Sequence, residues 1–191
     1  MEHLLKFTDE EKITLIRSRK ASIPELNALS KDDDWVVRWN VAAYLMTPVD
    51  ILKSLSKDKD WFVKMAVIEN PNVTVDIIED VAKDIIDKSI INDKFLNKLI
   101  QSIVKNEKTP AYLLERLSKS DDAYTRWYLA GNINTPIEIL KELSNNNEIK
   151  PIKEAVIINP SVTTEILKDM LKNESKETKL LIKMVLEERG I

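Results

Sequence analysis

The chain has 191 residues, of which 43% are hydrophobic and 32% charged, so it can bury a sizeable core beneath a well-solvated surface. Twenty-nine Lys and Arg stand against 32 Asp and Glu, for a net charge of −3, which argues against a protein that is basic overall and coats nucleic acid or anionic lipid. The chain has no cysteine, one histidine (His3) and two glycines, Gly131 and Gly190. The absence of cysteine excludes disulfides, iron–sulfur clusters and thiolate zinc, the single histidine removes nearly every zinc or His-base mechanism, and two glycines cannot build a phosphate-cradling loop. We therefore expect no metal and no cofactor.

The first residues, MEHLLKFTDEEK, become acidic too early for the apolar stretch of a signal peptide. No apolar run approaches the ~18 residues of a membrane span. We expect a cytoplasmic protein without a membrane partner.

The sequence repeats itself with a period of about 26 residues. Segments 70–82, 106–118, 132–144 and 159–171 align without gaps, and 44–56 differs mainly in lacking the leading Asn. A degenerate first copy ends at residues 24–30. Each copy has an apolar anchor, at Leu26, Leu52, Ile78, Leu114, Leu140 and Leu167. The one long spacing, between Ile78 and Leu114, indicates an insertion of about ten residues in the third copy.

In chain order, Thr8 and Glu11 form a capping box that opens a helix running to about Arg19. Each copy then predicts two short helices separated by a polar break such as KDDD (31–34) or KDKD (57–60). Thr47-Pro48, Thr109-Pro110 and Thr135-Pro136 are expected to cap first helices, and Glu138 to complete a box with Thr135.

Second helices are expected to end at the Asn-Pro pairs of copies two and five. The third copy has a longer second helix, and a last helix spans about 175–189. We predict an all-α, right-handed solenoid of about six two-helix repeats. It would be a single domain over 1–191, with cap helices at 1–21 and 175–191 and repeats over 22–174.

The segment TPVDILKSLSKDKDWFVKMAVIENP (47–71) resembles the leucine-rich repeat variant family and the wider HEAT-like helical repeats. The resemblance covers residues ~22–180 and implies stacked helical pairs. Some members of the family carry a Cys-rich iron–sulfur segment, which this cysteine-free chain lacks.

Basic residues recur twelve or thirteen positions after the anchors. This basic ladder comprises Arg38, Lys64, Arg126, Lys153 and Lys179. HEAT-like repeats often pair such residues with an interhelical Asp, which would tie one repeat to the next. Alternatively, the ladder is a row of cations that meets an anionic partner.

The four tryptophans fall in two columns, Trp35 with Trp61 and Trp39 with Trp127, one helical turn apart. Val37, Val41, Val63 and Val67 occupy the expected core positions instead. The tryptophans either fill the space between repeats or line a concave groove as binding anchors. The candidate groove residues are Trp35, Arg38, Trp39, Trp61, Lys64, Met65, Arg126 and Trp127. Ile100 replaces the basic residue in copy three, where we expect the insertion to bend the solenoid or to shape one wall of the groove.

Acidic clusters at 32–34 and 58–60 precede second helices, where carboxylates cap free N–H groups. They lack the Gly and the distal Glu of a Ca²⁺ loop.

Two principal functions remain open, and we expect a protein without enzymatic activity. The first is a binding scaffold that presents its groove to a peptide, protein or other elongated partner. The second is DNA binding or base excision, by resemblance to HEAT-like DNA glycosylases that use aromatic and Arg residues with a catalytic Asp. Ala43 and Gly131, rather than a carboxylate, follow Trp39 and Trp127 by one turn, and the net charge opposes phosphate binding. A module that assembles edge to edge is a third reading.

Overall fold

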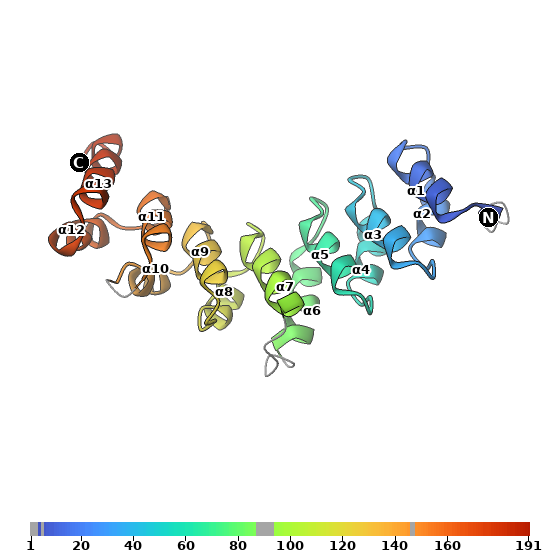
Figure 1. The fold of residues 1–191 in the computed structure, drawn as a ribbon, viewed down its shortest axis with the longest axis horizontal. Helices are drawn as coiled ribbons and strands as arrows, with labels where there is room; N and C mark the ends of the chain where they lie inside the picture. The colour runs from blue at the N-terminus through green and yellow to red at the C-terminus, as the bar shows by residue number, and fades with distance from the viewer. Residues whose placement is uncertain (1–3, 5, 87–93, 146–147) are drawn as a thin grey trace. The chain divides into compact units, whose positions relative to one another are not determined.

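The computed structural model describes residues 4, 6–86, 94–145 and 148–191. Thirteen helices and no strand occur in these ranges, which confirms the all-α prediction (Figure 1). His3, Asn147 and much of the copy-three insertion lie outside the described residues.

Short first helices alternate with slightly longer second helices. The first unit, Met1–Ile103, contains α1 (Asp9–Arg17), α2 (Ile23–Leu29), α3 (Trp35–Ala43), α4 (Val49–Leu55), α5 (Trp61–Glu69) and α6 (Val75–Ile86). The boundary falls within α7 (Lys94–Lys105). The second unit, Val104–Ile191, contains α8 (Ala111–Leu117), α9 (Ala123–Gly131), α10 (Ile137–Leu143), α11 (Lys150–Ile158), α12 (Thr164–Asn173) and α13 (Lys176–Glu188).

Helix length separates the third copy from copies one, two, four and five. The first helices α2, α4, α8 and α10 have seven residues, and the second helices α3, α5, α9 and α11 have nine. In copy three both helices, α6 and α7, have twelve. The predicted lengthening of the second helix is confirmed, and the first helix is lengthened as well.

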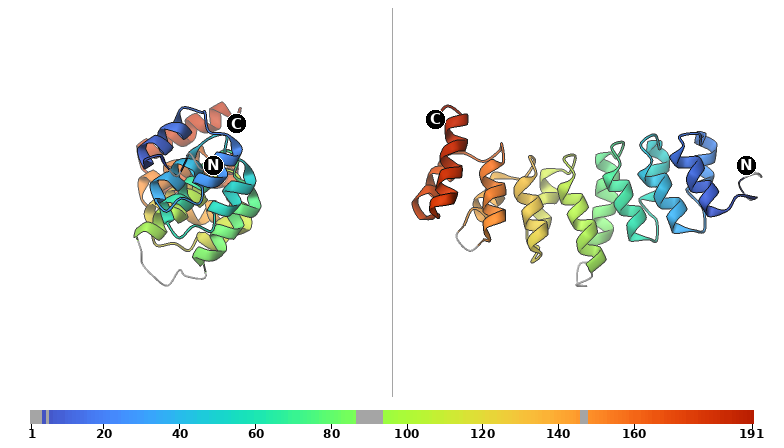
Figure 2. Two further views of the ribbon diagram at one scale, coloured as in Figure 1. Left: turned by 90° about the vertical axis from the view of Figure 1, so that its right-hand side faces the viewer. Right: turned by 45° about the horizontal axis from the view of Figure 1, so that its top comes forward.

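Second helices pack on second helices within each unit. In the first unit α3 contacts α1 and α5, with α2 and α4 alongside, and Figure 2 shows these helices following one another in blue to green. In the second unit α11 contacts α9 and α13, with α10 against α9 and α11. Helix α1 thus lies against α3 as a second helix lies against its successor, and its Lys12 precedes Arg38 by one 26-residue period.

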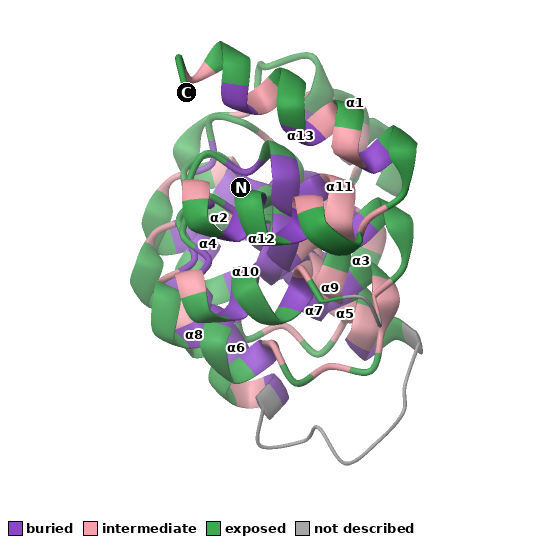
Figure 3. Ribbon diagram, turned by 90° about the vertical axis from the view of Figure 1, so that its left-hand side faces the viewer, coloured by how far each residue is buried: buried purple, intermediate pink, exposed green. Residues whose placement is uncertain are grey.

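The repeat anchors form the core. Five of the six anchors are 0% exposed, namely Leu52, Ile78, Leu114, Leu140 and Leu167, and Leu26 is 2% exposed. The predicted core valines of α3 and α5 are also 0% exposed. Figure 3 shows the buried stretches alternating with exposed ones along single helices. This one-sided burial is what the helical spacing of the apolar residues predicts.

The predicted Thr caps are wrong at Thr47, Thr109 and Thr135, and Glu138 forms no capping box with Thr135. The N-cap residues of α4, α8 and α10 are Pro48, Pro110 and Pro136, whose side chains make no capping hydrogen bond. The hydroxyls of Thr47 and Thr135 instead turn back and donate to the carbonyls of Val41 (2.5 Å) and Leu129 (2.6 Å). Both threonines are buried, so their hydroxyls serve the ends of the preceding second helices, whose carbonyls would otherwise lack a partner.

The predicted caps at Thr8 and at the acidic clusters are confirmed. The Thr8–Glu11 box is present, and Asp34 and Asp60 accept from the N–H groups of Val36 and Phe62. Helices α5 and α11 end at Asn70 and Asn159, each before a proline.

A buried asparagine joins the ends of successive second helices. The Asn70 amide donates to the carbonyls of Ala42 (2.7 Å) and Tyr44 (2.9 Å), one repeat earlier. Asn132 does the same toward Val104 and Asn106, and Asn159 toward Ala130 and Asn132. We call this contact the asparagine clamp. In the last helix Arg189 takes its place and donates to the carbonyls of Val162 and Asn159.

We expect Asn159→Ala to lower the free energy of unfolding by about 3 kcal/mol, because two buried carbonyls lose their partners. Urea denaturation would measure this loss. Asn145→Ala, at an exposed position, is the control and should change stability by less than about 0.5 kcal/mol. Equal, small effects of both substitutions would contradict a structural role for the clamp.

Candidate binding surface on the second helices

The basic ladder is engaged in ion pairs. Arg38 donates from Nε and Nη2 to both carboxylate oxygens of Asp58 (2.7 and 3.0 Å), and both side chains are only 7% exposed. Its Nη1 also bonds the carbonyls of Asp32 and Asp33. One guanidinium therefore holds the break before its own helix and the break of the next repeat.

The same arrangement recurs at the other ladder positions. Lys64 pairs with Asp84 (2.5 Å), Arg126 with Glu148 (2.8 Å) and Lys153 with Glu174 (2.8 Å). Arg126 also bonds the carbonyls of Ser120 and Asp121, as Arg38 does in its own repeat. Lys179 departs from the pattern, since its ammonium approaches the Lys172 carbonyl at 3.5 Å. In copy three the aligned Ile100 is buried.

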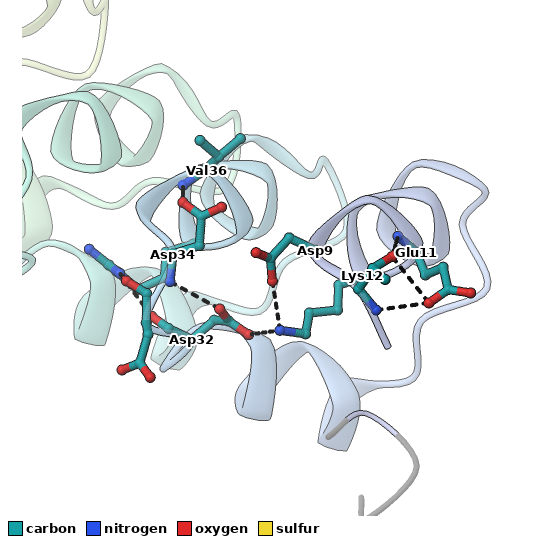
Figure 4. Close-up of polar contacts among 9 residues, drawn as sticks. Asp9, Glu11, Lys12, Asp32, Asp34 and Val36 are labelled. Carbon is teal, nitrogen blue, oxygen red and sulfur yellow. Dashed lines mark hydrogen bonds and ion pairs between the residues drawn. The ribbon is translucent and has the colours of Figure 1, made fainter. Parts of the chain in front are cut away.

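Lys12 of α1 extends the ladder toward the N-terminus. Its ammonium lies between Asp9 (2.8 Å) and Asp32 (2.9 Å), as Figure 4 shows. The hydrogen bonds to Asp9 and Asp32 raise the pKa of Lys12. Asp32 also accepts from the Asp34 N–H, so the acidic cluster serves as a cap and as an ion-pair partner. The ladder member Lys12 could have been found from its spacing of 26 residues to Arg38.

The Arg38–Asp58 pair makes stability depend on pH. Burial acts to raise the pKa of Asp58, but the hydrogen bonds from Arg38 and the Asp60 N–H together hold it below its ordinary value. A carboxyl with a lowered folded-state pKa contributes stability above its unfolded pKa and loses it as the pH falls through the folded value.

We expect Asp58→Asn to lower the free energy of unfolding by about 3 kcal/mol at neutral pH, because it leaves a buried guanidinium without its counter-charge. The deficit should begin to shrink below about pH 4, where Asp58 of the unfolded chain takes up a proton, and should shrink further as the pH falls through the lower pKa of Asp58 in the folded protein. Urea titrations across this range would measure it, with the exposed neighbour Asp33→Asn as control. A deficit that does not depend on pH would contradict the ion-pair assignment.

The predicted groove residues divide into buried and accessible ones. Arg38 and Lys64 are each 6% exposed, so these cations hold repeats together more than they face a partner. Trp39, Trp61 and Met65 are half-buried, and the Lys64 ammonium lies 5.0 Å from the Trp61 ring centre. Trp35 and Trp127 are 41% and 42% exposed. Arg126 and Trp127 belong to the second unit and the other six residues to the first.

An exposed aromatic row in the first unit was not predicted. Trp35 lies 5.5 Å from Phe62, and Phe62 lies 5.6 Å from Phe95, measured between ring centres. The two phenylalanines are 40% and 48% exposed. The sequence signal for this row is that Phe62 directly follows Trp61 at the start of α5.

The second unit contains a hollow of about 700 Å³ beside Trp127. Its apolar lining comes from three second helices: Trp127 and Tyr128 of α9, Ala155 and Ile158 of α11, and Leu181 of α13. Lys105, Glu107 and Glu154 supply charge, and the Lys105 ammonium lies 6.0 Å from the Tyr128 ring centre. Gly131 also lines this second-unit hollow, and a Cβ added there would meet no atom within 4 Å.

The first unit contains a smaller hollow, of about 330 Å³, beside Trp39. Its residues Arg17, Arg19, Trp39 and Ala43 lie 88 residues before Lys105, Glu107, Trp127 and Gly131, the same separation as the anchors Leu26 and Leu114. The two hollows thus occupy the same position in the repeat. A small residue one turn after the tryptophan leaves the space open, whereas copies two and five have Glu69 and Ile158 there.

Searches of protein-family models, curated proteins and solved structures found no match to this chain. The resemblance to the leucine-rich repeat variant family therefore stays a prediction. Within the described ranges, no cluster of three His, Cys, Asp or Glu side chains has the arrangement of a metal site. None of the helices described combines the length and apolar character needed to cross a bilayer.

Proposed function

We propose that this protein is a non-enzymatic binding scaffold, a right-handed α-solenoid whose second helices present a concave surface to a peptide, protein or other elongated partner. The 26-residue period and the recurrence of the asparagine clamp and the ion pairs in both units support the solenoid. The observation that carries the binding function is the second-unit hollow, where a half-exposed tryptophan borders a largely apolar depression.

The chemistry of the second-unit hollow suits the side chain of a partner protein. Its volume lies within the ~300–1,000 Å³ usual for ligand sites. Tryptophan and tyrosine supply large contact areas with few rotatable bonds, which is why they dominate the binding energy of interfaces. Because α9, α11 and α13 each contribute, the partner would contact several repeats at once.

DNA binding is the second candidate, and the engagement of the ladder weakens it. Arg38 and Lys64 are buried in ion pairs, and Arg126 and Lys153 are paired as well. A duplex binder relies on many cations facing phosphates.

The hollow can be tested with random peptides displayed on phage. We expect the wild-type protein to enrich peptides that share a large apolar residue. Trp127→Ala should lower the affinity for these peptides by about 30-fold or more, the loss typical of an interface anchor. Gly131→Phe should block binding by filling the hollow, while Gly131→Ala, which adds one methyl in open space, should retain it. No enrichment, or equal enrichment on Gly131→Phe, would refute this site.

Trp127 should matter little for folding. We expect Trp127→Ala to lower the free energy of unfolding by about 1 kcal/mol, because much of the ring is already in water. Leu129→Ala, at a fully buried position of the same helix, should cost about 2–5 kcal/mol. Thermal and urea denaturation would compare the two, and equal losses would show that Trp127 is a packing residue.

Duplex DNA should bind more weakly than micromolar near 0.15 M salt, with an affinity that falls steeply as salt rises. Fluorescence anisotropy of a labelled duplex measures this. Sub-micromolar affinity at that salt concentration would make DNA binding the leading candidate for the function of this protein.

A further inference from the structure

The first-unit hollow differs from its counterpart in charge. Arg17 and Arg19 stand where the second unit has Lys105 and Glu107. Of the described residues that line the first-unit hollow, none is acidic. The segment Arg17-Ser18-Arg19-Lys20 adds a third exposed cation directly after Arg19. The same position in the repeat is thus cationic in one unit and mixed in the other.

Arg17 is oriented for an anionic ligand. Its Nε donates to the Asn40 side-chain oxygen (2.9 Å), and the Asn40 amide donates to the Val36 carbonyl (2.8 Å). Asn40 is only 5% exposed, so a buried residue of α3 holds the guanidinium. No described residue accepts a hydrogen bond from the two Nη nitrogens of Arg17. These nitrogens can therefore present a pair of donors to a carboxylate.

Arg19 occupies a backbone position that favours glycine. Its φ is +61°, and the N–H groups of Arg19 and Lys20 bond back to the carbonyls of Ile16 and Leu15 at the end of α1. Helix α13 ends in the same turn, with Gly190 at φ +72° and equivalent bonds from Gly190 and Ile191. An L-residue in this conformation is strained relative to glycine. The turn therefore does not explain why the residue is arginine.

The rest of the first-unit hollow is apolar. Trp39 and Tyr44 are half-buried, whereas Leu45 and Met46 are 56% and 69% exposed. At about 330 Å³ the space suits one large side chain. Two cations beside one apolar depression match a short segment in which carboxylates flank an apolar residue. A nucleic acid would need a longer row of cations.

We propose that the first-unit hollow binds an acidic peptide segment of a partner protein. An apolar side chain of the segment enters beside Trp39, and neighbouring carboxylates bond Arg17 and Arg19. The inference rests on the proposed scaffold function. It specifies the chemistry of a partner for the first-unit hollow, whereas the scaffold function is argued from the second-unit hollow.

The test uses the full chain and two fluorescein-labelled peptides, one with a leucine flanked on each side by glutamates and one with lysines in their place. Anisotropy titrations at low and moderate salt should show binding of the glutamate peptide, weakened as salt rises, and at least tenfold weaker binding of the lysine peptide. Absence of binding by the glutamate peptide, or equal affinity for both peptides, overturns the proposal.

Arg19→Gly separates binding from folding. We expect it to lower the affinity for the glutamate peptide about tenfold or more. The Tm should stay equal or rise by about 2 °C, because glycine suits the left-handed turn. Arg17→Gln should also weaken binding, and Gly131→Phe in the second unit should leave it unchanged. Unchanged affinity of Arg19→Gly overturns the proposal.

The same titration with a fluorescein-labelled duplex DNA tests the alternative ligand. If the duplex binds more tightly than the glutamate peptide, and Arg19→Gly weakens its binding too, the hollow is a nucleic-acid site and the proposal is overturned. The random-peptide selection tests the scaffold function separately, at the second-unit hollow. If that selection succeeds and the glutamate peptide does not bind, this inference is rejected and the scaffold function is retained.

Discussion

A buried asparagine amide at the end of one second helix donates hydrogen bonds to two carbonyls at the end of the preceding one, and the structure of each unit depends on this contact. Helices of seven and nine residues are too short to be stable alone. Their terminal carbonyls also need partners. Asn70, Asn132 and Asn159 supply these partners and set the spacing between successive second helices. The threonine hydroxyls of Thr47 and Thr135 satisfy a further carbonyl at the same helix ends.

Once the second helices are spaced in this way, the ladder cations come within reach of acidic residues 20 to 22 positions later, as in Arg38 with Asp58 and Arg126 with Glu148. The charges most regularly repeated along the chain are therefore engaged inside the structure. Several aromatic side chains of the second helices remain accessible, including Trp35, Phe62 and Trp127. Binding energy on such a surface would come from apolar contact, with local charge selecting among partners.

The two hollows illustrate how one repeat position acquires different chemistry. Both lie beside a tryptophan and open over a small residue, Ala43 or Gly131. The residues that differ are on the preceding second helix and just after it, where Arg17 and Arg19 correspond to Lys105 and Glu107. Such side chains can vary without disturbing the core, because the buried anchors do not line either hollow.

The all-helical fold, the anchors, the Asp caps and the Asn-Pro helix ends could be predicted from the sequence, because each depends on residues within a turn or two of one another. The candidate tryptophans were also found by their period. The sequence alone did not reveal the clamp, the true partners of Thr47 and Thr135, the burial of Arg38 and Lys64, or the two hollows. Each of these depends on how far one second helix lies from the next. Tertiary packing decides that distance, because it sums contacts between residues about 26 positions apart.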